Sequence, residues 1–306
     1  MSTPDPADLL HRFVRESAFA QRGAVITDLD GTAVHEDAGR VVIPKTVSHG
    51  LGQVHALARP IVINTLRFPL NVIRTFGREW YSITRAPLPL VSLNGSLVGH
   101  LHETPAGEIE FEEALAFPLA TAQVRAVLDD VSTLLAAGIE DLALFHYPRD
   151  WRAGEIVWTP DPARVPALRE RYRSASEVFA APLRELRERL LARELCMLLL
   201  LVEAEAGRLM AYQHVQPRRF HTAPGVDKLH GARVVAGLLG VELAESVGAG
   251  DTPMDNFLDG VGLAVQVGEL DLPFHGRRHT LRVGSSLELG ELLFRLADLH
   301  RPAAQA

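Results

Sequence analysis

The sequence predicts an α/β protein with a doubly wound parallel sheet as its core and an inserted α+β domain. Two observations lead to this fold class. Near both ends of the chain, short apolar runs alternate with helical segments, and each run stops at a polar or glycine-containing turn, which is typical of buried parallel strands. Between about residues 101 and 215 the alternation is lost, and helices and strands follow one another less regularly.

The first hundred residues show the alternation most clearly. In order, we expect a helix at 7–20, a strand at 24–27, a helix at 45–58, a strand at 60–65, a helix at 70–80 and a strand at 88–93. The three strands end at Asp28, Thr65 and Asn94. Because ligands bind beyond the carboxyl ends of parallel strands, these polar residues mark the expected site.

The middle of the chain is expected to have a core of its own. Its expected elements are a hairpin at 98–112, a helix at 119–136, strands at 142–147 and 156–159, a charged helical segment at 163–193, and a second hairpin of strands 195–202 and 208–214. From Val226 onward the alternation returns, with a helix at 228–240, strands at 246–251 and 262–267, a short helix at 253–259, a strand at 279–283 and a helix at 285–299. We therefore expect a discontinuous core domain, 1–100 and 216–306, and an inserted domain, 101–215.

Composition is that of an ordinary globular protein of 306 residues, with 47% hydrophobic and 23% charged residues. The net charge of −7 argues against a nucleic-acid-coating protein, which needs a basic face. The most apolar run, Leu195–Val202, is far shorter than the roughly 20 residues of a membrane span. The N-terminus does not resemble a secretion signal. We therefore expect a cytoplasmic protein with no nucleic-acid or membrane partner, and the sequence does not indicate its oligomeric state.

Cysteine and histidine give no sign of a disulfide or a zinc site. The single cysteine, Cys196, lies in an apolar run and excludes an internal disulfide. The 13 histidines are scattered along the chain, and none of the expected helices carries a pair of them at the i,i+4 spacing. Zinc is therefore not expected.

The run Asp28-Leu29-Asp30-Gly31-Thr32 is the strongest chemical motif. Two carboxylates two residues apart, between a buried strand and a glycine turn, can both face one cavity. Taken alone, the run is more often a turn, and a calcium loop is a further alternative. The next residues, Thr32-Ala33-Val34-His35-Glu36, depart from the ligand spacing of a calcium loop.

Together with later residues, this run resembles the motifs of the haloacid dehalogenase (HAD) superfamily of phosphatases. The later residues are Thr65 at the end of the second strand, Lys228 after the middle block, and Gly250–Asp255 at the end of another strand. The resemblance covers residues 23–100 and 218–290. The large insertion, and Asn94-Gly95 after the third strand, resemble the Cof-type or class IIB branch. The resemblance implies a Rossmann-like core with an α/β cap.

The resemblance also implies a role for each motif residue. Asp28 would be the nucleophile and form an aspartyl-phosphate, while Asp30 would protonate the leaving oxygen and then activate water. Mg²⁺ would be held by Asp28, by Asp251 and by the backbone carbonyl of Asp30. Asp255 would support the metal through its waters or hold Lys228 in place. The phosphoryl group would be bound by Thr65, the N–H of Leu66 and Lys228, with supporting roles for Gly31, Thr32, Asn94 and Arg67.

Three residues depart from the family pattern. Leu66 and Leu229 stand where the second and third motifs often have glycine, and Met254 stands where the fourth often has asparagine. The departures remove no acid, hydroxyl group or lysine. Because of them, the substrate specificity of a family member cannot be assigned to this chain by resemblance alone.

The leading hypothesis is a Mg²⁺-dependent phosphatase of a small phosphorylated metabolite, with sugar phosphate as the best substrate class. The alternatives are a trehalose-, sucrose- or mannosylglycerate-phosphate type of phosphatase, a sugar phosphomutase and a non-catalytic metabolite-binding module. Specificity should lie in residues 102–215. There Tyr147, Trp151 and Trp158 could line a sugar pocket, although single aromatic residues more often belong to the core.

Overall fold

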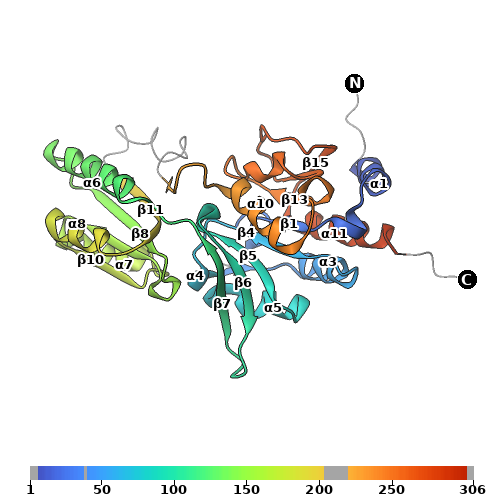
Figure 1. The fold of residues 1–306 in the computed structure, drawn as a ribbon, viewed down its shortest axis with the longest axis horizontal. Coiled ribbons are helices and arrows are strands. Elements are labelled where there is room, and N and C mark those ends of the chain that lie inside the picture. The colour runs from blue at the N-terminus through green and yellow to red at the C-terminus, as the bar shows by residue number, and fades with distance from the viewer. Residues whose placement is uncertain (1–5, 38–39, 203–219, 302–306) are drawn as a thin grey trace, which may run out of the picture. The chain divides into compact units, whose positions relative to one another are not determined.

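The computed structural model describes residues 6–37, 40–202 and 220–301. The chain divides into two compact units, and Figure 1 shows their elements. Unit 1 consists of Met1–Arg67, Val72–Leu115 and Val226–Ala306, and unit 2 of Phe68–Asn71 and Ala116–Gly225. The expected strand at 208–214 lies outside the described residues.

Unit 1 is built on an eight-stranded sheet in the order β15-β14-β13-β1-β4-β5-β6-β7. The strands are β1 (Val25–Thr27), β4 (Ile61–Asn64), β5 (Leu88–Ser92), β6 (Leu97–Glu103), β7 (Ile109–Ala116), β13 (Val247–Gly250), β14 (Leu263–Val267) and β15 (His279–Val283). From β15 to β5 all neighbours are parallel, and β6 runs antiparallel to β5. The predicted parallel α/β sheet is confirmed. After β1 the chain extends the sheet first on one side and later on the other, so the strand order reverses at β1.

The helices of unit 1 are α1 (Pro6–Glu16), α2 (Phe19–Arg22), α3 (Lys45–Ala56), α4 (Pro69–Val72, whose first residues belong to unit 2), α5 (Arg78–Thr84), α10 (Lys228–Leu239) and α11 (Ser286–Leu299). Glycines let helices pack closely at two places. A Cβ on Gly50 of α3 would lie 2.4 Å from the carbonyl oxygen of Gly290 in α11. A Cβ on Gly231 of α10 would lie 2.3 Å from Val91 Cγ1 of β5, so this close packing brings the first residue of α10, Lys228, toward the strand ends.

Three local expectations for unit 1 were incomplete. The helix expected at 7–20 is interrupted after Glu16, where the Ala18 N–H donates to the Glu245 carboxylate at 2.7 Å. The helix expected at 70–80 contains a π-helical turn, Ile73–Gly77. A small antiparallel pair, β2 (His35–Asp37) and β3 (Arg40–Val42), follows the Asp28 motif and was not predicted.

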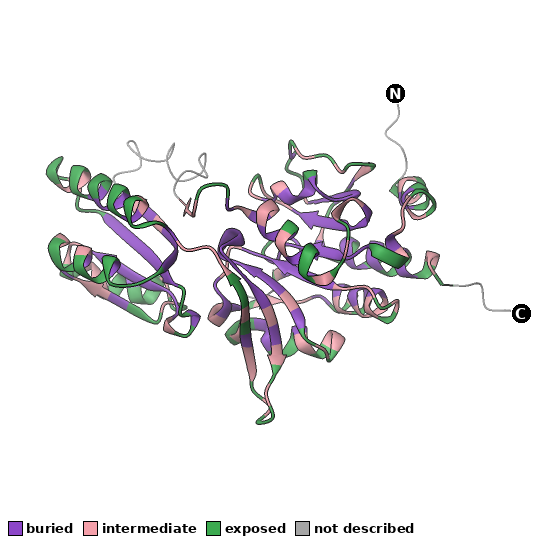
Figure 2. Ribbon diagram, in the orientation of Figure 1, coloured by how far each residue is buried: buried purple, intermediate pink, exposed green. Residues whose placement is uncertain are grey.

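Unit 2 contains a five-stranded sheet in the order β10-β9-β8-β11-β12. The strands are β8 (Leu142–Pro148), β9 (Ile156–Thr159), β10 (Glu177–Ala180), β11 (Leu195–Val202) and β12 (Phe220–His221), and the helices are α6 (Thr121–Ala136), α7 (Val165–Arg171) and α8 (Leu183–Leu191). β10 lies inside the segment expected to be helical, because Glu177–Ala180 pairs with β9. Figure 2 shows that the strands are largely buried, while the helices are exposed on one side.

Aromatic residues of unit 2 belong mainly to its core. Trp158 is fully buried in a cluster with Leu128, Leu186 and Leu198, and its indole N–H donates to the Ala181 carbonyl at 2.9 Å. Tyr147 and Trp151 are also buried. Among the described residues, no helix is both long enough and apolar enough to cross a membrane.

Candidate active site

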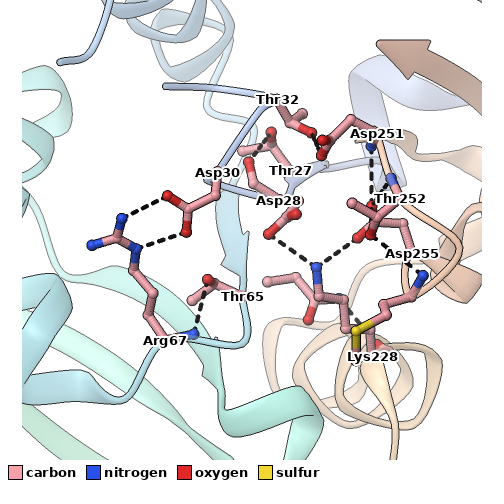
Figure 3. Close-up of polar contacts among 12 residues, drawn as sticks. Thr27, Asp28, Asp30, Thr32, Thr65, Arg67, Lys228, Asp251, Thr252 and Asp255 are labelled. Atoms are coloured by element: carbon pink, nitrogen blue, oxygen red, sulfur yellow. Dashed lines mark hydrogen bonds and ion pairs between the residues drawn. The ribbon is translucent and has the colours of Figure 1, made fainter. Parts of the chain in front are cut away.

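The carboxyl ends of three neighbouring strands of unit 1 carry the main candidate residues. Asp28 follows β1, Thr65 follows β4 and Asp251 follows β13, while Lys228 begins α10 (Figure 3). Since the strand order reverses at β1, this is the sheet edge at which an α/β fold forms its ligand site. The site therefore combines segments far apart in the sequence.

Lys228 joins two carboxylates at the bottom of the site. Its Nζ lies 2.9 Å from Asp28 Oδ1 and 2.6 Å from Asp255 Oδ1 (Figure 3). The side chains of Lys228, Asp28 and Asp255 are 1%, 8% and 0% exposed. A cation at a helix N-terminus is unfavourable by itself, and here the two carboxylates compensate for it.

The second oxygen of Asp255 is also fully engaged. Asp255 Oδ2 accepts hydrogen bonds from the N–H of Asp251 at 3.0 Å and from the N–H and Oγ1 of Thr252 at 2.8 and 3.0 Å. Both carboxylate oxygens therefore have protein donors. This geometry suits a residue that fixes Lys228 and the loop after β13, which was one of the two roles considered for it.

Asp251 lies across from the turn that follows Asp28. Its Oδ1 accepts a hydrogen bond from Thr32 Oγ1 at 2.7 Å. Gly31 has a φ of 76°, and a Cβ there would lie 2.2 Å from Asp251 Oδ2. Glycine is therefore required at position 31 both by its backbone conformation and by the nearby carboxylate.

Carboxylates gather at this point in a way that suits a cation. One oxygen each of Asp28, Asp251 and Asp255 lies within 4.8 Å of the others. Since both oxygens of Asp255 have donors, Asp28 and Asp251 are the better ligands. Carboxylate oxygens are hard donors, so Mg²⁺ is the kind of ion that this set fits.

The pKa values of these groups are shifted by burial and by their close spacing. Burial raises the pKa of Asp28 to about 8, against the lowering effect of Lys228, and Asp255 adds to the rise. Burial also raises the pKa of Asp251, although the hydrogen bond from Thr32 opposes the rise. Burial would lower the pKa of Lys228, but the charges of Asp28 and Asp255 outweigh it and hold this pKa above its ordinary value. Burial is therefore the main influence on both Asp28 and Asp251, and the charge of Lys228 offsets it only in part.

Asp30 points to a different partner. Arg67 Nε donates to Asp30 Oδ2 at 2.7 Å, and Arg67 Nη2 donates to Oδ1 at 2.6 Å (Figure 3). The Asp30 side chain is 51% exposed, whereas that of Arg67 is 21% exposed, and the guanidinium lies over the Phe76 ring at 5.0 Å. Arg67 is thus placed to hold the Asp30 carboxylate in position at the mouth of the site.

Thr65 and its neighbours form a tight loop. Thr65 Oγ1 accepts a hydrogen bond from the Arg67 N–H at 3.1 Å, and the Thr65 carbonyl accepts one from the Asn94 N–H at 3.3 Å. Asn94 has a φ of 56°, and a Cβ on Gly95 would lie 2.1 Å from the Asp227 carbonyl oxygen. Asn94-Gly95 is thus a buried turn that packs against the start of α10. Leu66 lies in the same loop, between the two residues that the Thr65–Arg67 hydrogen bond joins.

Sequence reasoning missed the residues that fix the start of α10. Asp227 caps the helix, with its Oδ1 accepting the His230 N–H at 2.7 Å. Asn256 Nδ2 donates to Asp227 Oδ2 at 2.7 Å, and Asn256 Oδ1 accepts the Leu229 N–H at 3.0 Å. An aspartate just before the first helical residue is a recognised capping signal. Asn256, two positions after Met254, thereby links the segment after β13 to the start of α10.

Comparison with solved structures identifies the fold. A subclass IIB sugar phosphatase of the HAD superfamily aligns with a TM-score of 0.61 and 15% identity, covering 88% of this chain and 96% of that chain. A HAD superfamily phosphatase from Bacteroides thetaiotaomicron aligns with a TM-score of 0.60 and 17% identity, covering 92% and 96%. A HAD/Cof-like hydrolase from Plasmodium vivax aligns with a TM-score of 0.66 and 16% identity, covering 95% and 99%.

Comparison of the sequence itself gives no match to a protein-family model and none to a curated protein. The structural alignments cover both units of the chain, and they match nearly the full length of each relative. At identities of 15–17% they show the fold.

Proposed function

We propose that this chain, which has the fold of the HAD superfamily hydrolases, is a Mg²⁺-dependent phosphatase that uses Asp28 as its nucleophile. The observation that carries the proposal is the buried contact of Asp28 with Lys228, beside Asp251 and at the reversal point of the sheet. A binding module needs no buried carboxylate aimed at its ligand. The full set of an acid, a lysine, a hydroxyl group and a second acid fits phosphoryl transfer better than it fits ligand binding alone.

Asp28, Asp251 and the backbone carbonyl of Asp30 would hold Mg²⁺. The ion would supply positive charge that shields the Asp28 carboxylate from the anionic substrate. Burial is the main cause of the raised pKa of both Asp28 and Asp251, and acidic neighbours add to the rise, so a bound cation would favour their charged forms.

In the proposed reaction, Asp28 attacks the phosphorus atom, and the bond from phosphorus to the alcohol oxygen breaks. Lys228 orients Asp28 and neutralises the phosphoryl oxygens, while the Thr65 hydroxyl group and the Leu66 N–H donate hydrogen bonds to them. Asp30 would leave its ion pair with Arg67, take up a proton from solvent, and give that proton to the departing alcohol oxygen. It then removes a proton from the water that hydrolyses the aspartyl-phosphate, which releases inorganic phosphate.

For the substrate we propose a small phosphorylated metabolite, most simply a sugar phosphate. The support is that one structural relative is described as a subclass IIB sugar phosphatase. The cap proposed from the sequence, residues 101–215, overlaps unit 2 over residues 116–215, and this part would exclude bulk water and select the substrate. Its Trp158 belongs to the core cluster of unit 2, so selectivity is expected to depend on other side chains of that unit.

The test is hydrolysis of p-nitrophenyl phosphate and of a panel of sugar phosphates, with and without Mg²⁺. Asp28→Asn should reduce phosphate release by at least about 1,000-fold, because an amide cannot accept the phosphoryl group. The control is Asp8→Asn, which changes an exposed aspartate of α1. Equal turnover by the wild type and Asp28→Asn would contradict the proposal, and rearranged sugar phosphate without inorganic phosphate would instead indicate a mutase.

A further inference from the structure

A second group of metal-binding side chains lies on the hairpin of β6 and β7, away from the motif residues. His100 and His102 are two residues apart on β6, so their side chains project from the same face of the strand. Leu101 between them is fully buried on the opposite face. Glu112 comes from the neighbouring strand β7. Figure 1 shows the two strands as a long hairpin at the edge of the sheet of unit 1.

The three side chains converge closely. One ligand atom of each lies within 4.8 Å of the others. His100 Nε2 is 3.1 Å from Glu112 Oε2, and the two imidazole centroids are 5.7 Å apart. The Nδ1 atom of His102 is buried and has no hydrogen-bond partner among the described residues.

Strands hold these side chains in place. A Cβ on Gly99 would lie 2.0 Å from the Glu112 carbonyl oxygen, so the two strands approach closely at this point. Leu101 and Phe111 are buried on the other side of the hairpin and anchor it. A site on two paired strands keeps its geometry better than a site on a loop.

We infer that His100, His102 and Glu112 form a second metal site, which takes a divalent transition-metal ion of the Zn²⁺ type. Two imidazole nitrogens and one carboxylate oxygen are a donor set that Zn²⁺ prefers, whereas Mg²⁺ prefers oxygen alone. Three protein ligands leave a fourth position open to water or to another ligand. The inferred site shares no residue with the cluster of Asp28, Asp251 and Asp255.

A cross-strand ion pair is the competing explanation. It would account for His100 and Glu112, since opposite charges commonly pair between strands. It does not require a second histidine on the same face, within reach of the same carboxylate, with a buried nitrogen that lacks a partner. A shared metal ion would explain why all three side chains converge.

The test is Zn²⁺ binding by metal-stripped protein, measured by calorimetry, together with the visible absorption of bound Co²⁺. The background is Asp28→Asn with Asp251→Asn, which removes the carboxylate cluster as a competing site. This protein should bind one equivalent of Zn²⁺. His102→Ala and Glu112→Gln should each weaken that binding by at least about 100-fold and remove the Co²⁺ absorption, while the control His11→Ala should not.

Two outcomes decide the inference. Retained Zn²⁺ affinity in both His102→Ala and Glu112→Gln, or no Zn²⁺ binding by the background protein, would overturn it. Because Glu112 is 64% exposed, Glu112→Gln is expected to fold normally, and circular dichroism checks this. Phosphatase activity does not enter the test, so its result stands apart from the proposed function.

Discussion

The two aspartates of the last motif have different surroundings. Asp255 is fully buried and has donors on both oxygens, whereas within the described part of the chain Asp251 accepts one side-chain hydrogen bond, from Thr32. A residue with both oxygens engaged cannot give one to a metal ion without losing a donor. The difference supports the proposal that Asp251 is a metal ligand and that Asp255 positions Lys228.

Replacing each aspartate should therefore have a different effect on Mg²⁺ dependence. Asp251→Asn should raise the Mg²⁺ concentration needed for half-maximal activity by about 100-fold, because it removes a charged ligand. Asp255→Asn should mainly lower kcat, because Lys228 loses one of its two partners. Mg²⁺ titrations of both variants at saturating substrate measure this. Equal changes in Mg²⁺ requirement would show that Asp255 is also a ligand.

The positions of the candidate residues could be predicted from strand ends, but their partners could not. Asp28, Thr65 and Asp251 follow recognisable apolar runs, so the sequence places them at one sheet edge. The Asp30–Arg67 pair and the link from Asp227 to Asn256 depend on how loops meet in space. The His100 and His102 pair was missed because only helical spacing was considered, and because Glu112 comes from another strand.

At the level of elements, two incorrect secondary-structure predictions have the same cause. The segment at 163–193 is rich in Arg and Glu and reads as helix, yet Glu177–Ala180 forms β10 because β9 offers it an open edge. The segment at 7–20 is interrupted at Ala18 by the distant Glu245. In both cases a tertiary contact overrides the local preference, and no pattern within the segment reports that contact.

The central strand β8 contains a histidine that should make unit 2 sensitive to acid. Burial lowers the pKa of His146 from 6.5 to about 3, and Arg193 and Arg189 act in the same direction. Between about pH 3 and pH 6.5, His146 therefore binds a proton in the unfolded chain but not in the folded chain. Stability is therefore lost as the pH falls below 6.5, by about 2 kcal/mol at pH 5.

His146→Leu should remove this part of the acid sensitivity. The difference in unfolding free energy between pH 7 and pH 5 should shrink by about 2 kcal/mol in the variant. Urea denaturation at the two pH values measures it, and His11→Leu, at an exposed position of α1, is the control. An unchanged difference in His146→Leu would mean that His146 does not titrate as a buried group.

At the scale of the whole molecule, the chain consists of two units with separate sheets and separate cores. The sheet of unit 1 contains eight strands and that of unit 2 contains five. The division into a strand–helix core and an α+β insertion was visible in the sequence, because the periodicity of apolar residues changes between them. This change in periodicity does not locate the boundaries between the units precisely. Strands β6 and β7 continue the sheet of unit 1, and unit 2 begins after Leu115.

Every proposed Mg²⁺ ligand belongs to unit 1, so Mg²⁺ should stabilise that unit alone. At 100 times its dissociation constant, a ligand that binds only the folded state adds about 2.7 kcal/mol to stability. Hydrogen exchange measured by mass spectrometry should show slower exchange in β1 and β13 when Mg²⁺ is added. Exchange in β8 and β11 should not change, because these strands belong to the core of unit 2.

Two variants make this test specific. Asp251→Asn should abolish the Mg²⁺ effect in β1 and β13. Leu128→Ala, in the core of unit 2, should speed exchange in β8 and β11 by destabilising that unit by about 3 kcal/mol, with the Mg²⁺ effect in unit 1 intact. Equal protection of both units by Mg²⁺ would mean that they open as one cooperative body.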